Sequence, residues 1–326
     1  MEDGGPVDAG GEAPGRMTVL VTGVRSRTHL VYVASYLRTL PPDTTVRYLE
    51  GGSFLSATVS RDDVINALPL SVEFTDSTTG LAPKGPVTYV AVGAPGLRPL
   101  AALRRSDPLR RITTVVVDEG LGTYGDWRTR RAAYLRQGGS QARSTVRAGA
   151  IATGQRTLTN LRWPLYRKEA DWAVFEPVAA EFHRALGPVD ATAFEPDRAI
   201  LLTQPWVDLG LVDAATYARH VAALAAEQRA AGRQFLVRSH PAEAPGRYAD
   251  YETLPIDVPA ELDPAVVTAD LLIGASSTAL LNLAALHDRP VLRVLPPGTE
   301  ALERALSADQ RSLLSRYLPP PVSPVV

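Results

Sequence analysis

The chain has 326 residues, of which 45% are hydrophobic and 21% are charged. That length corresponds to about two domains, and the hydrophobic content excludes a wholly disordered protein. The sequence contains no cysteine, which excludes disulfides, thiolate metal sites and cysteine nucleophiles. No apolar run reaches the roughly 18 residues of a membrane span, and no signal-peptide pattern opens the chain. These features predict a cytoplasmic protein.

Short apolar runs alternate with helical patterns in both halves of the chain. Residues 1–16 are rich in glycine and acidic residues and predict a disordered leader. The pattern of the first half then predicts strands at 18–22, 87–92 and 112–117, and a helix over 28–40. The second half predicts strands at 199–203, 234–238, 271–273 and 291–295, and helices over 213–231 and from about 276.

Strands that are apolar along their whole length are typical of parallel sheets buried on both faces. We therefore predict an α/β protein with two Rossmann-like domains, over residues 17–190 and 197–318. Glycine and proline cluster near 187–196 and indicate the linker, and the proline-rich residues 319–326 predict a tail. In such sheets ligands bind at the carboxyl ends of the strands, so functional side chains are expected there.

Two adjacent carboxylates, Asp118 and Glu119, follow the strand at 112–117, and Gly120 and Gly122 come directly after them. Adjacent residues on extended chain point in opposite directions. One carboxylate would then face the cleft as a general base, while the other anchors the loop. Ordinary loop and helix-capping roles are the alternative.

Two further strand ends carry polar groups suited to phosphate. His240 and Pro241 follow the strand at 234–238, and a histidine there can hydrogen-bond or protonate a phosphate oxygen. Ser276, Ser277 and Thr278 follow the strand at 271–273 and open a helix. Free N–H groups, the helix dipole and hydroxyls converge at such a point, although serine and threonine also cap helices without any ligand.

The basic residues are unevenly placed. Ten lie between residues 127 and 168 without a single acidic residue, so the remainder of the chain carries −11 (the net −1 less ten). An anionic acceptor, an anionic membrane surface or nucleic acid would be attracted to such a segment. We expect no nucleic acid, and we predict acceptor binding by Arg25, Arg128, Arg130 and Arg131.

The motifs come in the order acidic-acidic-Gly (118–120), His-Pro (240–241) and Ser-Ser (276–277). In this order they resemble the motifs of bacterial sialyltransferases, and Gly122-Thr123-Tyr124 makes the first most similar to that of polysialyltransferase-type capsule enzymes. The match covers residues 17–300 in motif order, and its detailed signal lies in about 25 residues. The resemblance implies a GT-B fold, with two Rossmann-like domains facing a central cleft.

It also implies an inverting, metal-independent transfer of a sialic-acid-like (nonulosonic acid) sugar from CMP, with no cofactor. Asp118 would be the general base with Glu119 beside it, and His240 would contact the donor phosphate and assist departure of CMP. Ser276 and Ser277 would bind that phosphate, and Glu261 would hold the ribose hydroxyls. Pro241, Thr278 and Gln204 are added as donor-site neighbours, and no residue is predicted as a metal ligand.

Two other functions remain open at this point. A CDP-alcohol phosphotransferase of the teichoic-acid type also combines GT-B architecture with His-Pro chemistry, although no second His-Pro pair occurs here. A non-catalytic nucleotide- or glycan-binding protein would not need the acidic motif. The expected partners are a CMP-activated sugar and an anionic or glycan acceptor, with peripheral contact at the inner face of the membrane.

Overall fold

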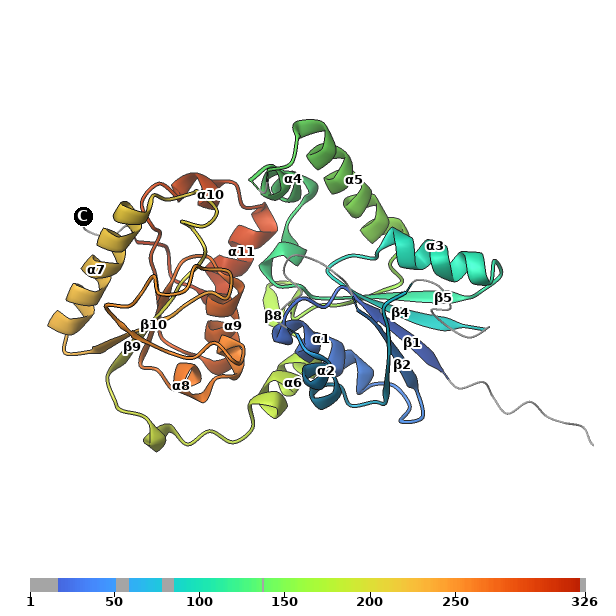
Figure 1. Ribbon diagram of the computed structural model, residues 1–326, viewed down its shortest axis with the longest axis horizontal. Helices are drawn as coiled ribbons and strands as arrows, with labels where there is room; N and C mark the ends of the chain where they lie inside the picture. Colours follow the sequence, from blue (N-terminus) through green and yellow to red (C-terminus); the bar gives the residue numbers. More distant parts are fainter. Residues whose placement is uncertain (1–16, 51–58, 78–84, 137, 323–326) are drawn as a thin grey trace, which may run out of the picture.

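The structure, a computed structural model, describes residues 17–50, 59–77, 85–136 and 138–322. The leader predicted for 1–16 lies outside these residues, as does the end of the tail. Two parallel sheets form two lobes that are joined along one side (Figure 1). Both predicted Rossmann-like units are therefore present.

The N-terminal lobe contains a six-stranded parallel sheet in the order β3-β2-β1-β4-β5-β6. Its strands are β1 (Thr18–Thr22), β2 (Thr45–Leu49), β3 (Val72–Thr75), β4 (Val87–Val92), β5 (Ile112–Val117) and β6 (Leu161–Trp163). Its helices are α1 (Arg27–Leu37), α2 (Arg61–Ala67), α3 (Leu97–Ser106), α4 (Trp127–Arg136), α5 (Gln141–Thr157) and α6 (Glu176–Leu186), with the turn η2 (Leu121–Tyr124) after β5. A small antiparallel pair, β7 (Tyr166–Lys168) and β8 (Trp172–Val174), precedes α6.

The C-terminal lobe contains a five-stranded parallel sheet in the order β11-β10-β9-β12-β13. Its strands are β9 (Arg198–Leu202), β10 (Gln234–Arg238), β11 (Glu252–Thr253), β12 (Leu271–Gly274) and β13 (Val291–Arg293). Its helices are α7 (Ala214–Ala230), α8 (Pro264–Val267), α9 (Thr278–His287), α10 (Glu300–Arg304) and α11 (Ala308–Tyr317), with the short turn η4 (Ala260–Leu262) before α8. The turn η3 (Ala191–Ala193) lies between α6 and β9 in the chain.

One hydrophobic core runs through both lobes. Alternate residues of β1 face opposite sides of the sheet, so Val19 and Val21 enter this core while Leu20 enters a separate one beneath α3. In the second lobe Ile200 and Leu202 enter the same shared core from β9. The inner faces of the two sheets therefore meet through a continuous apolar layer, to which α1, α6, α9 and α11 contribute.

The segment after the last helix continues the second sheet. Val322 pairs with Val294 in a parallel bridge, and its N–H donates to the carbonyl of Arg293. The described part of the predicted tail is thus held against β13. None of the helices in the described ranges is long and apolar enough to cross a membrane.

Candidate active site

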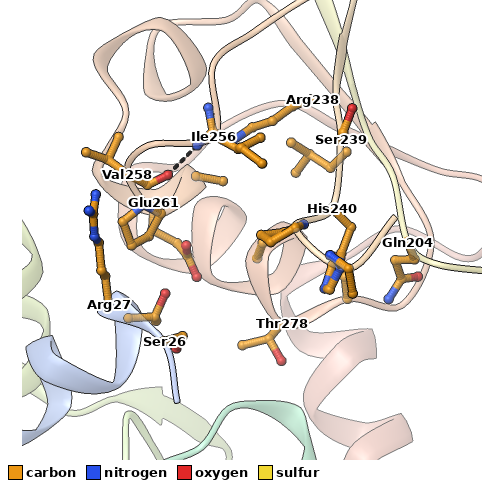
Figure 2. Close-up of a pocket in the computed structure, with 18 of the residues that line it drawn as sticks. Ser26, Arg27, Gln204, Arg238, Ser239, His240, Ile256, Val258, Glu261 and Thr278 are labelled. Atoms are coloured by element: carbon orange, nitrogen blue, oxygen red, sulfur yellow. Dashed lines mark hydrogen bonds between the residues drawn. The ribbon is translucent and has the colours of Figure 1, made fainter. Parts of the chain in front are cut away.

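A cleft of about 980 Å³ lies between the lobes, at the carboxyl ends of the strands. The N-terminal lobe contributes the β1–α1 loop, including Arg25 and His29, and Glu119 from the loop after β5. The C-terminal lobe contributes the ends of β9 and β10, the loop 256–261 and the start of α9. Figure 2 shows His240, Glu261 and Thr278 converging on this space from the second lobe.

Glu119 is the carboxylate of the acidic pair that reaches the cleft. Its side chain lies against two glycines, because a Cβ on Gly93 would be 2.2 Å from Oε2 and one on Gly122 would be 3.3 Å from Oε1. Burial raises the pKa of Glu119 above its ordinary 4.5, and the charges of Arg130 and Arg25 oppose this rise. The site therefore holds a desolvated carboxylate that is more basic than an exposed one.

Asp118 points away from the cleft and is 1% exposed. Its Oδ1 accepts the N–H groups of Glu119 (3.0 Å) and Gly120 (3.2 Å), and its Oδ2 accepts the N–H of Leu165 (3.0 Å) and the hydroxyl of Tyr124. Asp118 borders a second cavity behind the loop. The prediction that one carboxylate faces the cleft while the other anchors the loop fits this geometry. The residue that reaches the cleft is Glu119 and not Asp118, because these donors and the side chain of Thr123 hold Asp118 inward.

His29 ties the β1–α1 loop to the loop that carries Glu119. Its Nδ1 accepts the N–H of Arg25 at 3.1 Å, and its ring also hydrogen-bonds the backbone of Glu119. Desolvation lowers the pKa of His29 to about 4, so the ring is neutral at physiological pH. A neutral imidazole here fixes the backbone of the loop that carries Glu119.

The His-Pro loop on the opposite wall is held by the half-buried carboxylate of Glu243. The backbone N–H of His240 donates to Oε2 of Glu243 (2.8 Å) and to Oγ1 of Thr203 (3.0 Å), and the hydroxyl of Tyr248 donates to Oε1 of Glu243 (2.6 Å). Nδ1 of His240 accepts the N–H of Ala242 at 3.1 Å. The proton of the neutral ring is therefore on Nε2. Burial also lowers the pKa of His240, which favours this neutral form.

The three hydroxyl side chains at the start of α9, those of Ser276, Ser277 and Thr278, make different hydrogen bonds. Ser277 caps the helix by accepting the N–H of Leu280 at 3.1 Å, and it lines the cleft. Oγ1 of Thr278 accepts the N–H of Leu121 at 3.0 Å, and this hydrogen bond joins the loop that carries Glu119 to the second lobe. Ser276 instead donates to Glu303 (2.5 Å) and accepts from Arg293 (2.6 Å), outside the cleft. The structure thus brings two of the three hydroxyls to the site.

Glu261 is a buried carboxylate that lines the cleft. Its Oε1 accepts from Nδ2 of Asn282 at 2.9 Å, and the pKa of the carboxyl is raised by burial, partly opposed by this hydrogen bond and by the charge of Arg238. Figure 2 shows its carboxylate directed into the cleft. Arg238 itself pairs with Asp263 and donates to the carbonyl oxygens of Pro255 (2.6 Å) and Val258, which shapes the loop beside Glu261.

The remaining predicted site residues lie in two places. Gln204, Pro241 and Arg25 line the cleft. The other three predicted acceptor residues, Arg128, Arg130 and Arg131, are on α4, outside the cleft lining. Arg130 lies near the loop that carries Glu119 and donates to the carbonyl of Gly122 at 3.4 Å. Arg131 donates to the side chains of Thr145 and Gln141 on α5.

Sequence reasoning did not include several residues of the cleft among the site residues. Arg27 and His29 belong to an Arg-x-Arg-x-His segment directly after the first strand, a signal that could have been given more weight. Ile256 and Val258 form an apolar edge of the cleft although both are about half-exposed, and no sequence signal marks them. Within the described residues, no group of three or more histidine, aspartate or glutamate side chains is arranged to hold a metal ion.

No protein-family profile matches the chain, and no curated protein matches it in sequence. Solved structures similar in fold include the following two. An α/β-galactoside α-2,3-sialyltransferase from the luminous marine bacterium Photobacterium phosphoreum has a TM-score of 0.52 at 9% identity, over 92% of this chain and 96% of that one. A UDP-GlcNAc 2-epimerase from Methanocaldococcus jannaschii has a TM-score of 0.50 at 11% identity, over 92% and 91%. The predicted GT-B fold of two Rossmann-like domains is confirmed.

The glycine beside Glu119 allows the position of this carboxylate to be tested without removing it. A methyl group on Gly93 would occupy the place of the Glu119 carboxylate, and the φ of +73° adds backbone strain. We expect Gly93→Ala to fold, because the side-chain end can move aside, but to lower turnover at least about tenfold through misplacement of the carboxylate. Gly210→Ala, with a similar φ of +66° and nothing within 4 Å of the added methyl, is the matched control. Unchanged turnover in Gly93→Ala would remove Glu119 from the reaction.

Proposed function

We propose that the protein is an inverting glycosyltransferase that moves a sialic-acid-like sugar from its CMP donor to an acceptor hydroxyl. The observation that carries this proposal is that a carboxylate and a set of groups suited to bind a nucleotide lie on opposite walls of one cleft. A desolvated carboxylate, Glu119, lies on the N-terminal wall, and a helix N-terminus with His240 and Glu261 lies on the other. The motif order supports CMP as the nucleotide, and the GT-B fold, in which one structural neighbour is a sialyltransferase, is compatible with it.

In the proposed complex the donor binds the C-terminal wall. Its phosphate lies at the N-terminus of α9, where backbone N–H groups and the hydroxyl of Ser277 face the cleft, and Nε2–H of His240 donates to it. Glu261 accepts the ribose hydroxyls while Nδ2 of Asn282 holds its Oε1. Gln204 lies beside His240 (Figure 2) and adds an amide donor.

The proposed reaction is a single displacement at the anomeric carbon. The acceptor oxygen forms the new bond to this carbon while its proton passes to the carboxylate of Glu119. The bond between the anomeric carbon and the phosphate oxygen breaks, and its electron pair leaves with CMP. Because attack and departure occur on opposite faces, the configuration at the anomeric carbon inverts.

His240 acts in this scheme as a hydrogen-bond donor and not as a proton donor. Its Nδ1 already accepts the N–H of Ala242, so loss of the Nε2 proton would leave an imidazolate. The burial that lowers its pKa also disfavours the imidazolium form. We therefore propose that Nε2–H and the α9 N-terminus stabilise the developing charge on the phosphate, and that CMP departs unprotonated. Transfer without a metal is part of this proposal.

The donor site is tested by nucleotide affinity. Removing one hydrogen bond to a charged group costs about 1.5–3 kcal/mol, so His240→Ala should weaken CMP binding roughly 10–100-fold. Glu261→Gln should weaken CMP binding as well, because the amide cannot accept both ribose hydroxyls as a carboxylate does. Ser276→Ala is the control, since this hydroxyl is turned toward Glu303 and should leave CMP affinity unchanged. Calorimetric titration of each variant with CMP provides the measurement.

Other outcomes would replace the proposal. Tighter binding of CDP than of CMP, with the same dependence on His240, would favour the CDP-alcohol phosphotransferase. Consumption of UDP-GlcNAc without any acceptor would point to epimerase chemistry. CMP binding without hydrolysis or transfer, unaffected by Glu119→Gln, would leave a nucleotide-binding protein.

A further inference from the structure

Helices α4 and α5 form a projecting unit, which we call the arginine hairpin (residues 127–136 and 138–157). In Figure 1 these helices lie beside one another, and the C-terminal end of α5 reaches the N-terminal lobe, where Gln155 donates to the carbonyl of Gly93. The hairpin is internally tied, because the guanidinium of Arg147 lies 4.3 Å from the ring centroid of Tyr134 and Arg131 donates to Oγ1 of Thr145 at 2.6 Å. Its arginines therefore sit on an ordered scaffold.

Within the described residues, the charge of this hairpin is compensated only in part, by the electrostatic interactions of Arg128 with Asp126 and of Arg130 with Glu119. It contains no acidic residue, and none of its described arginine side chains makes an ion pair with a carboxylate. Arginines elsewhere do find carboxylates, as Arg38 does with Glu181 and Arg61 with Glu50. A general abundance of arginine in the chain therefore does not account for the unpaired charge. Arg128, Arg143 and Arg156 are all exposed to solvent.

Apolar side chains are exposed on and beside the same helices. Trp127 is 44% exposed at the start of α4 and Val146 is 71% exposed on α5, one helical turn from Arg143. Leu158 and Leu161, just after α5, are also exposed. A soluble polyanion gains nothing from such groups, whereas the interface of a bilayer takes up tryptophan and aliphatic side chains together with arginine.

We propose that the arginine hairpin docks the protein on the surface of an anionic phospholipid bilayer. The arginines contact lipid phosphates, to which guanidinium groups bind in a bidentate manner, and Trp127 and Val146 enter the headgroup region. The hairpin begins at Trp127, close after Tyr124 ends the loop that carries Glu119, and Arg130 reaches back to Gly122. Docking therefore presents the N-terminal wall of the cleft to acceptors held at the membrane. This inference does not depend on the identity of the donor.

Sedimentation of the full chain with vesicles tests the proposal. We expect binding to vesicles of phosphatidylcholine mixed with phosphatidylglycerol, little binding to phosphatidylcholine alone, and release as the salt concentration rises. Each basic residue near an anionic surface contributes on the order of fivefold to binding. The triple variant with Arg128→Glu, Arg143→Glu and Arg156→Glu should therefore bind the mixed vesicles at least roughly 100-fold more weakly than the unchanged protein.

A second triple variant keeps the net charge change the same but moves it elsewhere. Arg105, Arg219 and Arg229 are exposed and lie outside the hairpin, so their replacement by glutamate should weaken vesicle binding far less. The thermal melting temperature should be nearly unchanged in both triple variants, which shows that each is folded whatever the donor is. Trp127→Ser with Val146→Ser should weaken the binding that persists at high salt.

Three results would overturn the proposal. One is equal sedimentation with neutral and anionic vesicles. Another is an equal loss in the two triple variants, which would make binding a matter of net charge alone. The third is binding of a soluble polyanion such as dextran sulfate that the hairpin variant loses, without any binding to anionic vesicles. That last pattern would assign the hairpin to a polymeric acceptor.

Discussion

Glu119→Gln should lower turnover by roughly 10²–10⁴-fold while leaving CMP affinity nearly unchanged. The amide has the shape of the carboxylate but cannot accept the acceptor proton, and Glu119 stands on the wall opposite the donor groups. Steady-state rates with saturating CMP-sugar, together with CMP titration, give the two quantities. Full turnover in this variant would return the role of base to another group.

The same assignment predicts the direction of the pH dependence. Burial raises the pKa of Glu119, and only the ionised form can accept a proton, so kcat/KM should fall with decreasing pH through a pKa above the ordinary 4.5. The charge of Arg130 lowers this pKa. Arg130→Gln should therefore move the acid limb of the profile to higher pH. A limb that stays in place would mean that a different group is titrating.

Asp118→Ala should instead destabilise the protein strongly. The substitution leaves the N–H groups of Gly120 and Leu165 and the hydroxyl of Tyr124 without this acceptor, whereas the N–H of Glu119 keeps Oγ1 of Thr123. Each unsatisfied buried donor costs about 1–3 kcal/mol. We expect the free energy of unfolding to fall by at least about 3 kcal/mol, and thermal melting will measure the shift.

Asp118→Asn separates the structural from the catalytic reading of this residue. One amide oxygen still accepts the N–H groups of Glu119 and Gly120, whereas the amide nitrogen meets the N–H of Leu165 donor to donor. Stability should fall less than with alanine, and the folded fraction should keep much of its activity. A stable but inactive Asp118→Asn protein would contradict the exchange of roles proposed for the acidic pair.

The central strands of both sheets could be predicted because most of their residues are buried and consist of short runs rich in apolar residues. The strands β1, β4, β5 and β10 begin and end where the sequence pattern placed them. The outer strands β2 and β3 mix polar and apolar residues, as in Thr45–Leu49, and their pattern was not distinctive. Helix ends differ by a few residues, since α1 ends at Leu37 and leaves Leu40 in the following turn.

The cleft could be predicted in outline, because the carboxyl ends of parallel strands share one edge. What the sequence could not decide is the direction of single side chains. Asp118 turns inward because Leu165 and Tyr124 supply donors from segments that follow it in the chain, and no local pattern reports such a meeting. Ser276 is diverted in the same way by Glu303 and Arg293, which come after it.

The shared core also limits how this protein could be altered to take other substrates. Val19, Val21 and Leu121 of the first lobe share this core with Ile200, Leu202 and Leu280 of the second. If one whole lobe were exchanged for that of another GT-B protein, the remaining residues would face a surface that does not fit them. Neither lobe expressed alone would cover its inner face, so each should aggregate and not fold. New specificity is thus more accessible by substituting the loops that border the cleft, 25–29 and 256–261, than by building chimaeras.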